Sequence, residues 1–130
     1  MTIIECISSL KNLYHSEGAT DDSIAEVEKK LNLRLADDYK EYVSKYGVIS
    51  AKRIELTGII SSKRLNVADV TLNERELNPN FPDDMYVIEN IGIDGILLLQ
   101  KTNGSIYEFI PNKIPVKVYD NLTEYLRTKI

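Results

Sequence analysis

The fold of this chain is decided by the stretch Ile96-Leu97-Leu98-Leu99-Gln100-Lys101-Thr102-Asn103-Gly104-Ser105-Ile106-Tyr107-Glu108-Phe109-Ile110. Two largely apolar runs, residues 96–101 and 105–110, are separated by a short turn that contains Asn103 and Gly104. Asn-Gly between apolar runs is a strong signal for a β-hairpin, because both residues tolerate the positive φ that such turns require. The stretch therefore predicts two neighbouring antiparallel strands.

Further strands are predicted on both sides of this hairpin. Residues 85–90 precede it and are followed by the turn Gly92-Ile93-Asp94-Gly95, and residues 116–119 come after it. Upstream, residues 53–60 alternate apolar and polar side chains, which is typical of a half-buried strand. Residues 78–84 contain two prolines and several Asn and Asp residues, which predicts a loop. The resulting sheet is mostly antiparallel.

Five helices are predicted from apolar residues that recur at three- and four-residue steps. The first spans residues 3–13. The second begins at the capping residues 20–23, and the third begins near Asp37 and ends at Gly47. One helix, residues 66–77, is inserted among the strands, and a short one, residues 122–126, comes last.

Helices that precede a run of hairpin-linked strands indicate an α+β fold, with the antiparallel sheet packed against the N-terminal helices. The 130 residues contain no repeat and no long linker, so we expect one domain over residues 1–130. The longest unbroken apolar run, Gly95–Leu99, is far shorter than the ~20 residues of a membrane-spanning helix. No membrane association is therefore expected.

The composition indicates where the protein is located and what kind of partner it binds. The N-terminal residues lack the features of a secretory signal, and the single cysteine precludes an intramolecular disulfide, so we expect a cytoplasmic protein. The net charge of −4 argues against a nucleic-acid partner and favours a basic protein.

The sequence predicts no catalytic residue, no cofactor and no metal. Cys6 and His15 are the only residues of their types, and on one helix their Cα atoms would lie about 13 Å apart. They are also too few for a zinc site. Phosphate-binding and nucleophile motifs are absent. Adjacent carboxylates such as Asp21-Asp22 are typical of helix caps, so an enzyme that acts through carboxylates is the weaker alternative.

A set of motifs in fixed order resembles one known family. The most specific is Ile24-x-x-x-Glu28-x-x-Leu31-x-Leu33-x-Leu35-x-x-Asp38-Tyr39-x-x-Tyr42-Val43-x-x-Tyr46-Gly47. The others are Gly58-Ile59, Phe81-Pro82-x-x-Met85-Tyr86-Val87-Ile88, Gly92-x-Asp94-Gly95, Gly104-Ser105-Ile106-Tyr107-Glu108 and Asn121-Leu122-x-x-Tyr125-Leu126. Together they resemble the SUKH superfamily, which joins fungal cell-wall regulators of the Smi/Knr type to bacterial toxin-immunity proteins. The chain departs from the pattern at Ala36, where many members have proline, and it lacks tryptophan.

This resemblance implies a non-enzymatic immunity protein that binds a cognate polymorphic toxin of the nuclease type and occludes its active site. The alternative that it also implies is a regulatory protein-binding scaffold that has no link to a toxin. We expect a monomer or a weak homodimer. As contacts with the partner we predict acidic residues at turns and strand ends: Asp83, Asp84, Glu89, Asp94 and Glu108.

Overall fold

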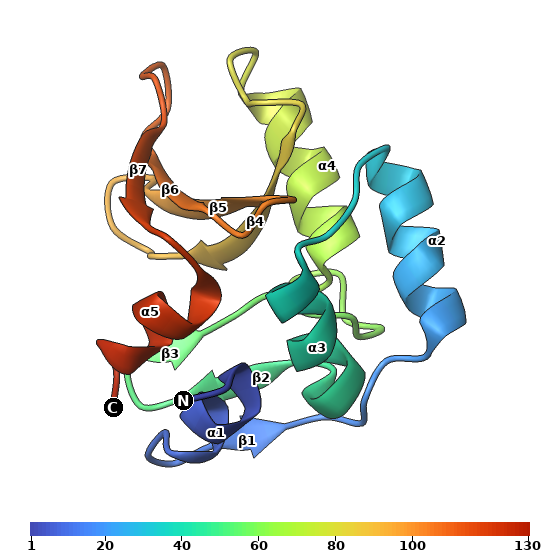
Figure 1. Cartoon of the computed structure of the whole chain (residues 1–130). Coiled ribbons are helices and arrows are strands. Elements are labelled where there is room, and N and C mark those ends of the chain that lie inside the picture. The colour runs from blue at the N-terminus through green and yellow to red at the C-terminus, as the bar shows by residue number, and fades with distance from the viewer.

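The computed structural model, which describes residues 1–130, has five helices and seven strands, and it confirms the α+β fold class (Figure 1). The helices are α1 (Ile3–Ser8), α2 (Asp21–Leu31), α3 (Asp37–Tyr46), α4 (Val67–Leu77) and α5 (Leu122–Arg127). The strands are β1 (Tyr14–His15), β2 (Ile49–Ala51), β3 (Ile54–Glu55), β4 (Met85–Asn90), β5 (Leu97–Lys101), β6 (Ile106–Phe109) and β7 (Val116–Tyr119). None of the helices combines the length and the apolar character needed to cross a bilayer.

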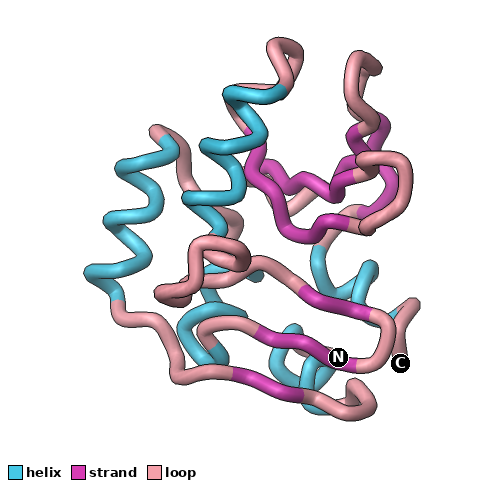
Figure 2. Tube along the Cα trace, turned by 180° about the vertical axis from the view of Figure 1, so that it is seen from behind, coloured by secondary structure: helices cyan, strands magenta, loops and turns pink.

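The strands form two antiparallel sheets, with the orders β1-β2-β3 and β4-β5-β6-β7. Figure 2 shows the two sheets from behind, with α2 and α4 side by side next to them. Thr57 links the sheets, because its backbone N–H donates to the Ile88 carbonyl (2.8 Å) and its hydroxyl donates to the Val87 carbonyl (2.8 Å). These two hydrogen bonds therefore connect the segment that follows β3 to β4 of the four-stranded sheet.

Both faces of the four-stranded sheet are covered, which explains the unbroken leucine run of β5. Successive side chains of a strand point to opposite faces. Leu98 belongs to the larger apolar cluster, which includes residues of α1, α3 and α5. Leu97 and Leu99 belong to a smaller cluster, against which Val70 of α4 packs. A strand that is buried on both faces carries apolar residues on both, and the buried polar residue of β5, Gln100, is hydrogen-bonded.

The predicted hairpin at residues 96–110 is confirmed, but its turn differs from the expected type. Only Gly104 has a positive φ (97°), so the assumption of positive φ at Asn103 is wrong. The Gly104 N–H donates to the Lys101 carbonyl (2.9 Å), and the Lys101 N–H donates to the Ser105 carbonyl (3.0 Å). This is a three-residue connection that ends in a left-handed glycine.

The first helix ends earlier than predicted, at Ser8 and not near residue 13. The hydroxyls of Ser8 and Ser9 both donate to the Glu5 carbonyl (2.9 Å each), a competing pattern that weakens helix continuation. The chain then forms β1, in which His15 pairs with Ile49. The assumption that His15 lies on the same helix as Cys6 is therefore wrong.

The strand predicted over residues 53–60 is also shorter and covers only Ile54–Glu55. Beyond β3, the Thr57 N–H bonds a carbonyl of β4, and the Gly58 N–H donates to the Leu65 carbonyl (2.9 Å). A Cβ on Gly58 would lie 2.1 Å from the Gly47 carbonyl oxygen, so the backbones approach too closely for any other residue. These long-range contacts end the strand.

Candidate interaction surface

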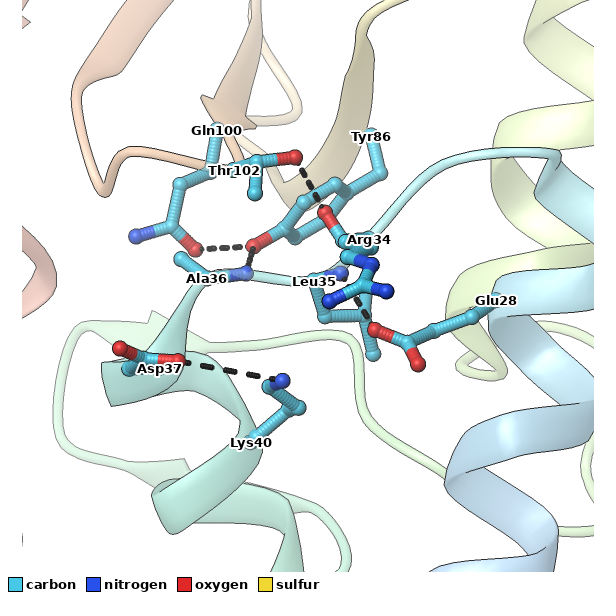
Figure 3. Close-up of polar contacts among 9 residues, drawn as sticks. All are labelled: Glu28, Arg34, Leu35, Ala36, Asp37, Lys40, Tyr86, Gln100 and Thr102. Carbon is cyan, nitrogen blue, oxygen red and sulfur yellow. Dashed lines mark hydrogen bonds and ion pairs between the residues drawn. The ribbon is translucent and has the colours of Figure 1, made fainter.

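Residues of several family motifs lie at a buried polar network between α3 and the four-stranded sheet (Figure 3). At its centre, the Tyr86 hydroxyl accepts a hydrogen bond from the Ala36 N–H (2.9 Å) and donates to Gln100 Oε1 (2.6 Å). The Gln100 amide in turn donates to Asp38 Oδ1 (3.0 Å) and to the Gly104 carbonyl (3.0 Å). The network therefore joins the start of α3 to β4, β5 and the hairpin turn.

Other polar contacts hold the segment that enters α3. The Leu35 N–H donates to Glu28 Oε2 (2.9 Å), and the Thr102 hydroxyl donates to the Arg34 carbonyl (2.5 Å) (Figure 3). The departure at Ala36 now has a physical reason: a proline there would lack the N–H that Tyr86 accepts. Glu28 of the motif is thus engaged within the fold.

Tyrosines of α3 form a second internal set around Thr57. The Tyr39 hydroxyl bonds the Thr57 hydroxyl (2.9 Å), while the Tyr42 hydroxyl donates to the Thr57 carbonyl (2.8 Å) and accepts from the Ile49 N–H (3.1 Å). Burial raises the pKa of both phenols. These tyrosines belong to the core.

The prediction that Glu89 contacts the partner is wrong. Its side chain lies in the interior, with the residue only 5% exposed, so it is not available to a partner as expected. The carboxylate accepts hydrogen bonds from the Glu55 N–H (2.9 Å) and the Tyr125 hydroxyl. It therefore joins β3, β4 and α5, and burial raises the pKa of this carboxyl group.

The structure divides the other predicted contact residues between two ends of the sheet. Asp83 and Asp84 are exposed just before β4, and Asp84 Oδ2 lies 3.8 Å from Lys101 Nζ. Asp94 is exposed in the connection after β4, at the opposite end of that strand. Glu108 is half-buried on β6, opposite Val116. The predicted acidic residues therefore do not form one cluster.

Exposed apolar side chains at one end of the sheet were missed by the sequence reasoning. The connections 91–96 and 110–115 lie at the same end of the four-stranded sheet, on the left in Figure 1. These two connections and the first residue of β7 carry a set of exposed aliphatic residues that we call the hairpin-end patch: Ile91, Ile93, Ile114 and Val116. The patch lies at the end of the sheet away from the turn 102–104. The sequence did contain a signal for this patch, because isoleucines occur inside predicted turns, where polar residues are usual.

A hollow of about 240 Å³ lies on the three-stranded sheet, and its lining includes His15, Ser50 and Glu55. Glu55 accepts two hydrogen bonds from Arg64 (2.8 and 3.3 Å), which lower the pKa of its carboxyl group. Cys6 is buried, and its thiol donates to the Thr123 carbonyl (3.8 Å). No three His, Cys, Asp or Glu side chains are grouped to hold a metal ion.

The fold is thus an α+β scaffold in which motif side chains such as Glu28, Asp38 and Tyr86 are hydrogen-bonded within the fold, and whose surface carries an exposed apolar patch at one end of the sheet. Over residues 2–130 the sequence matches the family model SUKH_5, described as SMI1-KNR4 cell-wall. The chain belongs to this family, which confirms the resemblance to the SUKH superfamily. A search among curated proteins gave no match.

Proposed function

We propose that this chain is an immunity protein, which binds a cognate toxin of the nuclease type and neutralises it by covering its active site. It acts in the cytoplasm and by binding, not by catalysis. The observation that carries this proposal is the use of the motif side chains Glu28, Asp38 and Tyr86 within the fold, the last two through Gln100. They stabilise a scaffold, and recognition is left to the surface.

Electrostatics supports a basic partner. The chain has a net charge of −4, and Asp83, Asp84 and Asp94 are exposed. A nuclease binds the phosphates of its substrate through basic groups, and complementary charge on an inhibitor raises the association rate. The inhibitor then competes with the substrate for the same groups.

The test is co-expression with the toxin domain that is encoded beside this gene. The expected result is rescue of growth and a co-purified complex, whereas the toxin domain alone stops growth. A toxin domain from an unrelated pair serves as the specificity control. Loss of rescue would contradict the immunity function.

Titration of purified toxin separates a binder from an enzyme. Occlusion predicts that inhibition is complete at one molecule of this chain per toxin molecule and stays incomplete below that ratio. Complete inactivation at a tenth of that ratio would contradict occlusion, because it would require turnover.

A regulatory scaffold is the second candidate, and the family description, which names the cell wall, favours it. It would bind a cellular protein with no relation to a toxin. Absence of neutralisation, together with altered sensitivity to cell-wall stress when the gene is deleted, would favour this function over immunity.

A further inference from the structure

We propose that the hairpin-end patch is the surface through which this chain binds its partner, and that the partner offers an apolar hollow bordered by lysine or arginine side chains. This inference rests on the proposed immunity function and adds the contact surface to it. Half of the large apolar side chains that the chain exposes lie between residues 91 and 118. Scattered exposed apolar residues need no explanation, whereas a gathered set marks an interaction site.

The connection 110–115 presents its isoleucine from a constrained loop. Ile114 is 88% exposed, and it stands between Pro111 and Pro115, whose rings restrict φ. The Lys113 N–H donates to the Ile110 carbonyl (3.0 Å) and closes the turn. A side chain on a loop that is already ordered loses little conformational entropy on binding, so Ile114 is suited to act as an anchor.

The connection 91–96 is closed in the same way. The Ile91 N–H donates to the Ile96 carbonyl (3.1 Å), and the Ile96 N–H donates to the Ile93 carbonyl (3.0 Å). A Cβ on Gly95 would lie 3.3 Å from Pro111 Cγ, which shows that the two connections touch. Ile93, which is 62% exposed, therefore belongs to the same end of the molecule as the second connection.

The adjacent edge strand argues against a second copy of this chain as the occupant. β7 is the outer strand of its sheet, and its pairing with β6 is interrupted by a register shift between Ile106 and Tyr107. It also carries Lys117, which forms an ion pair with Asp120 (2.9 Å). Bulges and lysines on edge strands discourage pairing with another strand. The patch is thus suited to side-chain contact with a different protein.

The charges around the patch indicate what borders the partner's hollow. Asp94 follows Ile93 directly, and Glu108 lies opposite Val116 in the register of β6 and β7. Lys113 is the one cation of the two connections. Carboxylates at the rim of an apolar contact favour a partner with basic groups at the matching positions, mainly through the association rate.

The test measures binding to the toxin domain used above, inactivated by mutation of its active site. Ile114→Asp and, separately, Ile93→Asp are expected to weaken the affinity at least about 30-fold, as for central anchors of an interface. The matched control is Leu77→Asp, because Leu77 is 66% exposed but lies at the end of α4. Its affinity is expected to stay within about threefold of the wild type. Circular dichroism checks that each variant is folded.

A second pair of variants tests the charges at the two ends of the sheet. Asp94→Asn is expected to slow association about twofold to fivefold at low salt, whereas Asp83→Asn leaves it unchanged. Asparagine is chosen because Asp94 has a positive φ (52°), which asparagine tolerates. Equal effects at both ends would contradict the predicted rim.

The outcomes separate this inference from the proposed function. If the wild type binds and both isoleucine variants bind equally well, the contact surface is wrong and the immunity function stands. If the wild type does not bind, both proposals fail. If sedimentation shows a wild-type dimer that Ile114→Asp dissociates, the occupant is a second copy, and the assignment to a foreign partner is overturned.

Discussion

The two ends of the four-stranded sheet differ in what their side chains do. At the hairpin turn 102–104, the side chains of Tyr86, Gln100 and Thr102 all bond other parts of the chain. At the other end, the connections 91–96 and 110–115 expose isoleucines to solvent. One end therefore stabilises the fold, and the other is free to contact another molecule.

This difference suggests how one scaffold serves many partners. The buried motif residues Asp38 and Tyr86 bond partners far along the chain, so their replacement alters the fold itself. In the exposed connection 91–96, the motif residues Gly92, Asp94 and Gly95 adopt the positive φ of the turn. The isoleucines of the two exposed connections make no long-range hydrogen bond, so their side chains can change without loss of the scaffold. Four variants, taken from the largest expected effect to the smallest, test this division.

Gly58→Ala is expected to destabilise the protein most, by about 3 kcal/mol, because the new methyl group would overlap the Gly47 carbonyl oxygen. The control is Gly92→Ala in an exposed turn, where no atom lies within 4 Å and only the positive φ is strained. That strain amounts to about 1 kcal/mol. Urea unfolding measures both, and equal losses would contradict the role of close backbone approach.

Asp38→Ala is expected to lower the unfolding free energy by about 2 kcal/mol. It removes the acceptor of the Gln100 amide (3.0 Å) and of the Leu122 N–H at the start of α5 (2.9 Å). The neighbouring Asp37 is the control, because it is exposed and its carboxylate lies 3.8 Å from Lys40. Asp37→Ala is expected to change stability by less than about 0.5 kcal/mol. A similar loss in both variants would mean that the network does not stabilise the fold.

Glu89→Gln is expected to change how stability depends on pH. Because burial raises the folded pKa of Glu89 above its ordinary value, folding favours the protonated carboxyl group. The stability that the Glu89 carboxyl group contributes is fully present below its unfolded pKa, and it is lost as the pH rises through its folded pKa. Glutamine cannot ionise, so the wild type should lose stability relative to this variant over that range.

Urea unfolding of the wild type and Glu89→Gln from pH 4 to pH 8 measures this difference. The charged and polar groups that face Glu89 are Tyr125, Glu55 and Lys129, and they are present in both proteins. Two stability curves that run parallel across the whole range would show that Glu89 titrates normally.

Ile114→Asp is expected to have the smallest effect on stability, within about 0.5 kcal/mol of the wild type, because the side chain is exposed. Thermal unfolding provides the measurement, and Leu98→Asp, at a buried position of β5, serves as the positive control. A marked loss at Ile114 would mean that the patch belongs to the scaffold and not to a contact surface.

The sequence by itself determined the elements whose signals are local. The hairpin around Gly104, the helix ending at Gly47 and the helix that begins after Asn66 follow from turn chemistry, capping and apolar spacing within a few residues. The tyrosines of α3 recur at helical spacing and belong to the core. Such preferences act over one or two turns and do not need the rest of the fold.

Only the tertiary structure decided which acidic residues are free. Glu89 follows a register shift in the pairing of β4 with β5, and it is buried because Tyr125 and the Glu55 backbone, 36 and 34 residues away, meet it. The short α1, the turn at Thr57 and the meeting of connections 91–96 and 110–115 likewise depend on contacts between distant segments. Local propensity does not encode such contacts, because they form only when the whole chain packs.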